Sequence, residues 1–162
     1  MEDLLIYSED GETVIGVYDN NLCDVKITKG VRKIGLRAFE NCTELSSIAI
    51  PETVEIIDDY AFAGCSSLQT IIIPNSVKSI GYQVFSGCEN LVRGEIYSQN
   101  AIDAFSYLKS MQEIIIGEGI KCIDNSAFSN CENLKTIIIP QSVSCIENNA
   151  FWNCSIIVFR DL

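Results

Sequence analysis

The chain has 162 residues, 48% of them hydrophobic, and a formal net charge of −11 at pH 7. This length and composition are typical of one folded domain with a substantial core, and they argue against a disordered chain. The acidic balance argues against nucleic-acid binding, which needs clustered Lys and Arg. No apolar run approaches the roughly 20 residues that a membrane-spanning helix requires.

Residues 1–21 are predicted to form a capping β-hairpin. The stretch "LLIYSEDGETVIGVY" contains two strand-like runs around Asp10-Gly11, a pair typical of hairpin turns. The hairpin would cover the first repeat, whose strand is expected at Val25 to Ile27. The acidic start lacks the basic region and long apolar stretch of a signal peptide. The chain as written is therefore expected in the cytoplasm, and outside the cell or on its surface if a leader was removed.

Residues 22–156 repeat a pattern of about 23 residues. Phenylalanine marks each unit, with spacings of 23, 23, 20, 23 and 23 between Phe39, Phe62, Phe85, Phe105, Phe128 and Phe151. Cysteine follows three residues later in five units, and isoleucine follows eleven residues later in five units. Each unit is too short to bury its own apolar positions, so neighbouring units must stack and share one core.

The segment "LQTIIIP" is predicted to be the strand of its unit. Alternation points Ile71 and Ile73 toward the core and Thr70 and Ile72 toward solvent. The proline lacks an N–H group and ends the strand. The Ala-Phe pair of each unit is expected to form a short helical turn on the opposite side. Stacking such units predicts a parallel sheet with one face on the core.

A shortened fourth unit lies near residues 94–111, within "RGEIYSQNAIDAFSYLKSMQ". Ser98 is predicted to cap a longer helix that carries Ala101, Ile102, Phe105 and Leu108 at helical spacing. Ile102 would replace a core isoleucine that this unit lacks. We favour a local change of curvature over a functional insertion. Residues 157–162 are expected to close the array with a last strand near Ile157 to Phe159, at either a natural or a trimmed end.

The segment "IDDYAFAGCSSLQTIIIPNSV" resembles the BspA-like, Treponema-type leucine-rich repeats of bacterial and protist surface proteins. The resemblance covers roughly residues 22 to 159. It implies a curved, right-handed solenoid with a concave parallel sheet and short helical or 3-10 turns on its convex side. It also implies roles in adhesion and protein binding at the cell surface, and it transfers no catalytic residue or cofactor.

Eight cysteines suggest three alternatives: buried thiols, disulfides or a metal site. Five share one repeat column, namely Cys42, Cys65, Cys88, Cys131 and Cys154. Cys122 and Cys145 share another column, and Cys23 stands alone. Buried Cys packs like a small hydrophobic residue, and no close pair such as C-x-x-C indicates zinc. We therefore favour structural thiols and expect no metal.

The sequence offers few candidate catalytic residues. The chain has no histidine, which removes every His-dependent nucleophile, general base and metal site. Asp58-Asp59 is better explained as solvated charge than as a catalytic pair. The basic cluster comprises Lys26, Lys29, Arg32, Lys33 and Arg37. It is interpreted as an edge that pairs with neighbouring acids, with an anion-binding patch as the alternative. We expect a non-enzymatic protein without a cofactor.

The outward strand positions form two columns, which we name the sheet face. One column contains Lys26, Ala49, Ile72, Glu95, Ile115 and Ile138. The other contains Asp24, Ser47, Thr70, Arg93, Glu113 and Thr136. Their isoleucines indicate either a binding surface or simple strand propensity, and both interpretations stay open.

Two functions of different class follow from the sheet face. The first is a monomeric scaffold that binds a protein or peptide there, with Lys26, Ala49, Ile72, Arg93, Glu95, Glu113, Ile115 and Ile138 as candidate residues. The second is a structural segment of a larger surface protein without a binding site. A sheet of this size presents about 300 Å², less than the roughly 800 Å² per partner of a standard interface. The face alone would support weak binding.

Overall fold

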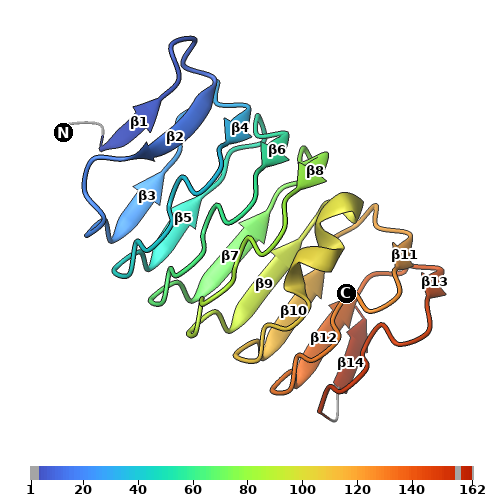
Figure 1. Cartoon of the computed structure of the whole chain (residues 1–162). Helices are drawn as coiled ribbons and strands as arrows, with labels where there is room; N and C mark the ends of the chain where they lie inside the picture. The colour runs from blue at the N-terminus through green and yellow to red at the C-terminus, as the bar shows by residue number, and fades with distance from the viewer. Residues whose placement is uncertain (1–3, 156–157, 162) are drawn as a thin grey trace.

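The protein is a solenoid of stacked turns, seen in a computed structural model that describes residues 4–155 and 158–161 (Figure 1). The main strands are β3 (Asp24–Lys26), β5 (Ser47–Ala49), β7 (Thr70–Ile73), β9 (Arg93–Ile96), β10 (Glu113–Ile116), β12 (Thr136–Ile139) and β14 (Val158–Asp161). A second set of short strands comprises β4 (Lys33–Ile34), β6 (Ile56–Ile57), β8 (Ser79–Ile80), β11 (Cys122–Ile123) and β13 (Cys145–Ile146). The predicted repeat solenoid is confirmed.

The main strands pair in parallel, as the stacking of the repeats predicts. Strand β7 shows the predicted alternation of inward and outward side chains. Ile71 and Ile73 are buried, whereas Ile72 is 47% exposed. Pairing runs without interruption through β7, β9, β10, β12 and β14, and β3 pairs separately with β5. Between β5 and β7 the backbone contact is reduced to the Ser67 N–H, which donates to the Thr43 carbonyl oxygen at 3.2 Å. Over the described part of the chain, the main sheet is therefore interrupted once.

A second parallel ladder runs along the opposite side of each turn and was not predicted. It pairs β4, β6 and β8, and separately β11 and β13. The turn that follows the main strand sets up these short strands, since the Val54 N–H donates to the Pro51 carbonyl oxygen at 3.0 Å and the Val77 N–H to that of Pro74 at 3.2 Å. Ile34 and Ile57 point inward from them with no exposed surface.

The predicted N-terminal hairpin is confirmed as β1 (Leu5–Tyr7) and β2 (Thr13–Val17), which pair antiparallel. At its turn Gly11 has φ +73°, and its N–H donates to the carbonyl oxygen of Ser8 at 2.9 Å. β2 pairs with β4, so the hairpin extends the second ladder and not the main sheet. The first main strand spans Asp24–Lys26, one residue earlier than expected.

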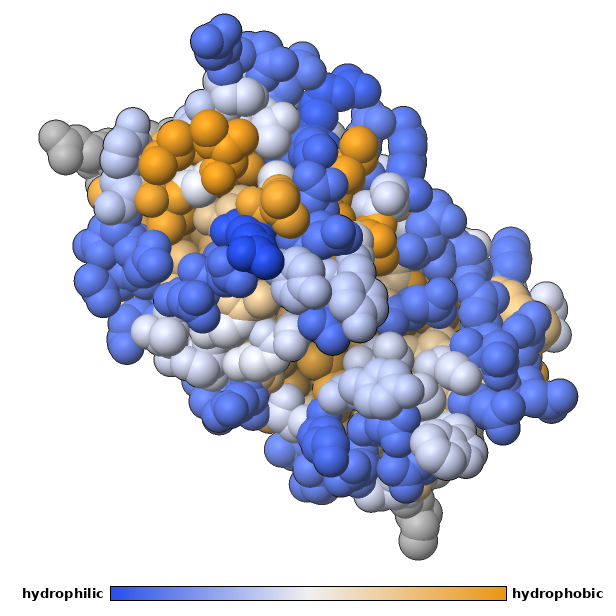
Figure 2. Space-filling view, in the orientation of Figure 1, coloured by the Kyte–Doolittle hydropathy of each residue, from blue (hydrophilic) through white to orange (hydrophobic). Residues whose placement is uncertain are grey.

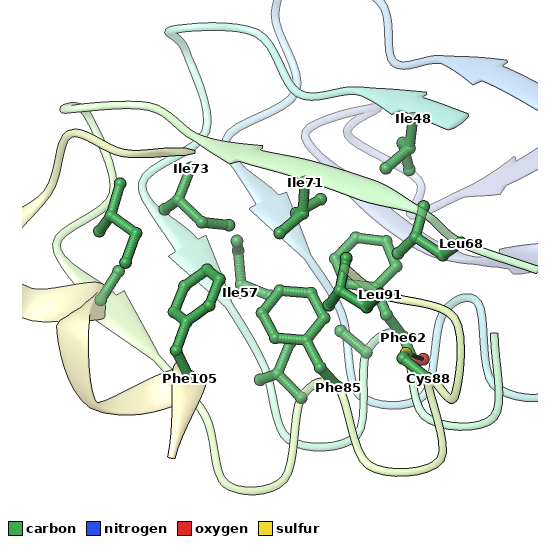
Figure 3. Packing of buried hydrophobic residues seen from close by; sticks show 14 of the residues in the cluster. Ile48, Ile57, Phe62, Leu68, Ile71, Ile73, Phe85, Cys88, Leu91 and Phe105 are labelled. Atoms are coloured by element: carbon green, nitrogen blue, oxygen red, sulfur yellow. Dashed lines mark hydrogen bonds between the residues drawn. The ribbon is translucent and has the colours of Figure 1, made fainter. Parts of the chain in front are cut away.

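A row of phenylalanine rings fills the core between the two ladders (Figure 3). The ring centroids of Phe39 and Phe62 are 5.3 Å apart, and those of Phe62 and Phe85 are 5.7 Å apart, with nearly parallel planes. Each ring is held by a short turn closed by i to i−3 hydrogen bonds, such as the Cys65 N–H to the Phe62 carbonyl oxygen at 3.2 Å. The Ala-Phe pairs therefore form the expected tight turns.

The shortened unit contains η1 (Gln99–Phe105), a 3-10 helix. The Ser98 hydroxyl accepts a hydrogen bond from the Asn100 N–H at 3.2 Å, so Ser98 caps the helix as predicted. Ile102 is buried and takes the place of the missing core isoleucine. Gly94 occupies an inward strand position because a Cβ atom there would lie 2.5 Å from Phe105 Cε1.

The last strand, β14 (Val158–Asp161), pairs with β12. It was expected near Ile157 to Phe159, and Ile157 lies outside the described residues. Among the described residues, no helix is long and apolar enough to cross a membrane.

Candidate functional site

The strand register aligns the residues of the sheet face in the two columns that the sequence predicts. Ile72 lies opposite Glu95, Glu95 opposite Ile115, and Ile115 opposite Ile138. On the separate pair of strands, Lys26 lies opposite Ala49. Lys26, Ala49 and Ile72 are exposed, whereas Ile115 and Ile138 are half-buried. The columns are therefore continuous from β7 to β12, with Lys26 and Ala49 on the separate pair β3 and β5, and their apolar part is less accessible than alternation alone suggests.

An ion-paired group lies in the middle of the sheet face. The Arg93 guanidinium contacts Glu113 Oε2 at 2.7 Å and Glu95 Oε1 at 3.1 Å. The Tyr97 hydroxyl donates to Glu95 Oε2 at 3.3 Å. Burial and the neighbouring Glu95 carboxylate raise the pKa of Tyr97. The charges of this face hold one another in place, with isoleucines on both sides of them.

The basic cluster makes contacts within the protein. Lys33 Nζ lies 2.7 Å from Asp58 Oδ2, and Arg32 contacts Glu55 at 2.5 Å. Arg37 lies over the ring of Tyr60, with 5.3 Å between its Cζ atom and the ring centroid. The ion pairs of Arg32 and Lys33 support the interpretation of this part of the cluster as an edge paired with neighbouring acids.

The adjacent acids Asp58 and Asp59 point to different partners. Asp59 Oδ1 accepts a hydrogen bond from the Tyr82 N–H at 2.7 Å, whereas the Asp58 carboxylate pairs with Lys33. Each carboxylate has a structural role of its own, and the two do not converge on one point.

The cysteines of the repeat column have a hydrogen-bonding role that the sequence analysis missed. The Sγ atom of Cys65 donates to the Phe39 carbonyl oxygen at 3.1 Å, one turn earlier, and Cys88 donates to that of Phe62 at 3.2 Å. Cys131 and Cys154 repeat this contact. Burial raises the pKa of Cys88 to about 12. All eight cysteines have free thiols, and the four that donate to carbonyl oxygens connect neighbouring turns of the solenoid.

A hollow of about 980 Å³ lies beside η1, on the side opposite the main sheet. Elsewhere backbone hydrogen bonds join the Ala-Phe turns, such as the Phe62 N–H to the Val84 carbonyl oxygen at 3.0 Å. Among the described residues, the equivalent N–H groups of Phe85 and Gly87 have no acceptor in the next unit, because η1 takes a different path. The shortened unit therefore opens the surface at this point.

Tyr107 lines this hollow at a position where the other units have only Gly or Asn, namely Asn41, Gly64, Gly87, Asn130 and Asn153. Its φ is +64°, in the left-handed region. This conformation costs a residue with a Cβ atom about 1–2 kcal/mol. The side chain is 69% exposed, so packing offsets little of that cost. Strained residues of this kind concentrate at functional sites, and the departure from the repeat column was a readable signal in the sequence.

Figure 2 shows the side of the molecule on which η1 lies. Most of this side is hydrophilic, and hydrophobic side chains gather near the N-terminal hairpin, where Leu4 and Ile15 are 43% and 51% exposed. The hollow beside η1 is lined by a mixture of polar and aromatic side chains, including Tyr82, Gln83, Asn100 and Asp103. It is therefore not a simple apolar patch.

Stacked repeat turns with a parallel ladder on each side define the chain as a leucine-rich repeat protein. A family model described as "BspA type Leucine rich repeat region (6 copies)" matches residues 17–104 and 101–160. The chain belongs to this BspA-type family, as its repeat pattern predicts. No curated protein is similar enough to be matched with it.

Several solved structures have a similar fold. A leucine-rich repeat protein from Eubacterium ventriosum has a TM-score of 0.76 and 20% identity, over 94% of this chain and 48% of that chain. One from Bacteroides ovatus has a TM-score of 0.61 and 26% identity, over 98% and 45%. The pneumococcal vaccine antigen PcpA has a TM-score of 0.67 and 21% identity, over 88% and 45%. The chain spans about half the length of these proteins.

Proposed function

We propose that this protein is a non-enzymatic scaffold that binds a protein or peptide through its sheet face. The observation that carries the proposal is the ion-paired group of Arg93, Glu95 and Glu113, which is flanked by outward isoleucines. Fixed charges beside apolar side chains give a partner both orientation and contact area. BspA-type repeat proteins are typically scaffolds and not enzymes, which supports the same conclusion.

The proposed location is the cell surface. One similar structure is described as a leucine-rich cell surface protein from Faecalibacterium prausnitzii, with 28% identity and a TM-score of 0.52. Another is a vaccine antigen. This chain corresponds to under half of either protein, so loops or further domains would extend the small binding area of the sheet.

The hollow beside η1 is a second candidate surface, and Tyr107 is the observation that supports it. A side chain that strains the backbone and stays exposed is suited to contact with a partner. Tyr is also enriched in the residues that dominate protein interfaces. The two surfaces lie on opposite sides of the solenoid, so substitutions can test them separately.

The experiment compares three variants in binding to partners recovered by pull-down from cells that produce the protein. Ile115→Lys with Ile138→Lys changes the sheet face, Tyr107→Asn changes the hollow, and Ile56→Lys is the control on the second ladder. If the sheet face binds, the first variant should weaken binding at least about tenfold, equal to about 1.4 kcal/mol.

The same experiment distinguishes the alternatives. Loss only in Tyr107→Asn would move the site to the hollow. Equal binding by all folded variants would contradict both surfaces and favour the structural segment without a site. Circular dichroism and urea unfolding should accompany each measurement, because the half-buried Ile115 and Ile138 also pack on the sheet.

A further inference from the structure

The second ladder brings together two cysteines that are 23 residues apart in the sequence. Cys122 in β11 and Cys145 in β13 lie directly opposite each other in parallel register. Neighbouring strands are about 4.8 Å apart, and no C-x-x-C spacing is needed to place two thiols side by side. Cys145 is exposed and Cys122 partly so, unlike the four buried thiols of the other column.

Glu147 adds a carboxylate to this pair of thiols. It lies two residues beyond Cys145, and its Oε2 accepts a hydrogen bond from the Asn125 N–H of the previous turn at 3.0 Å. The Sγ atoms of Cys122 and Cys145 and one Glu147 carboxylate oxygen all lie within 4.8 Å of one another. Within the described residues, no Lys or Arg forms an ion pair with Glu147.

Two sulfur atoms and one carboxylate oxygen form a donor set suited to zinc. Zn²⁺ binds Cys sulfur at about 2.3 Å and carboxylate oxygen at about 2.0–2.2 Å in tetrahedral geometry. Ligand atoms in such a site are roughly 3.5–3.8 Å apart, so a small rotation of these exposed side chains would complete it. Ca²⁺ and Mg²⁺ prefer ligand sets made only of oxygen. Thiolate ligands select softer ions.

We propose that Cys122, Cys145 and Glu147 form a Zn²⁺ site on the last two turns of the second ladder, with water in the fourth position. Binding replaces the two thiol protons, which pass to solvent, and forms two zinc–sulfur bonds and one zinc–oxygen bond. The inference goes beyond the proposed function because it requires no protein partner.

The location gives such an ion a structural role. η1 separates the pair β11 and β13 from the longer ladder of β1, β2, β4, β6 and β8, so two strands of two residues each stand alone. An ion bound to both strands would connect the last two turns, where only two residue pairs join β11 to β13 and, among the described residues, no further strand of the second ladder extends them. A ligand that binds only the folded state stabilises it by an amount that rises with the logarithm of the ligand concentration divided by its dissociation constant.

The test uses the full chain, reduced and freed of metal, with Co²⁺ as a spectroscopic probe. Co²⁺ should produce the visible absorption of a tetrahedral site and a near-ultraviolet sulfur-to-cobalt band, both lost when Zn²⁺ displaces it. Native mass spectrometry should find one ion per chain. Cys122→Ser and Cys145→Ser should each weaken binding at least about tenfold, and Glu147→Gln should weaken it less.

Cys23→Ser is the matched control, because Cys23 is an exposed thiol far from this pair in the repeat array. It should bind Co²⁺ like the unchanged protein, and circular dichroism should confirm the fold of every variant. Absence of binding, or binding that survives Cys145→Ser, would overturn the site. A Cys122–Cys145 disulfide in protein purified without oxygen would also overturn it, because zinc binds cysteine as the thiolate and a disulfide contains none.

Discussion

Tyr107 is expected to reduce the stability of the fold, because its left-handed backbone disfavours a bulky residue. Asn tolerates this conformation better and occupies the same column in three other units. Tyr107→Asn should therefore stabilise the protein by about 0.5–1 kcal/mol, as judged by urea unfolding. Tyr82→Asn, an equally exposed change outside the left-handed region, is the control. A destabilised Tyr107→Asn protein would show that the ring packs favourably after all.

Phe62 is completely buried between the rings of Phe39 and Phe85. Phe62→Ala removes two stacked contacts and leaves a cavity, so it should lower the free energy of unfolding by about 3–5 kcal/mol. Leu36→Ala, at a side chain that is 60% exposed, should change it by no more than about 0.5 kcal/mol. Similar losses in the two variants would contradict the role of Phe62 in the core.

For single residues, the sequence predicted burial but not hydrogen-bond partners. The repeat column identified the burial of Cys65 and Cys88, since regular spacing reports which side chains face the core. It did not reveal that their thiols donate to phenylalanine carbonyl groups one turn earlier. Such a contact depends on the stacking distance between turns, which no residue spacing encodes.

At the scale of elements, Gly94 and η1 depend on each other. The Phe105 ring is tilted by 46° from Phe85 and fills the space that a strand side chain would need at position 94. Gly94→Ala should cost about 1–3 kcal/mol through overpacking. The control Gly16→Ala places its Cβ at an ordinary 3.8 Å from Ile6 Cδ1 and should be nearly neutral.

A double variant tests the mechanism of that loss. Adding Phe105→Leu should cost less in the Gly94→Ala background than in the unchanged protein, because the smaller side chain relieves the clash. Strictly additive free energies from urea unfolding would mean that the two residues do not interact.

Elements differ in how far the sequence predicted them. The main strands were predicted because several alternating residues mark them, as in Thr70–Ile73. The strands of the second ladder were not, because two residues such as Ile56–Ile57 show no period, and only hydrogen bonding to the neighbouring turns makes them strands. The shared repeat column of Cys122 and Cys145 places them on neighbouring turns, but only the pairing of β11 with β13 shows that they lie directly opposite each other.

For the whole molecule, the buried thiols predict sensitivity to alkaline conditions. Burial raises the pKa of Cys88 and Cys131 from 9.0 to about 12. Their protonated forms therefore contribute stability that is complete below about pH 9 and is lost as the pH rises toward 12. The free energy of unfolding should fall over this window, and it should fall less steeply in Cys88→Ala. Identical pH profiles in urea unfolding would exclude this contribution.

The surfaces of the molecule were predicted unevenly. Strand alternation placed the sheet face correctly in its two columns, because side-chain direction follows directly from the period of a strand. The hollow beside η1 was not predicted, since it results from hydrogen bonds that one shortened unit fails to make with its neighbour. The sequence shows the shorter spacing of 20 residues between Phe85 and Phe105. Its effect on the surface, however, depends on the path of the backbone.

The interruptions of the two ladders occur at different heights along the solenoid. Where the main sheet is interrupted between β5 and β7, the second ladder continues from β6 to β8. Where the second ladder is interrupted between β8 and β11, the main sheet continues through β7, β9 and β10. Every junction between turns thus keeps backbone bonds on at least one side. A stretching force applied to the two ends would meet no junction without backbone hydrogen bonds, and the array should rupture in a single event.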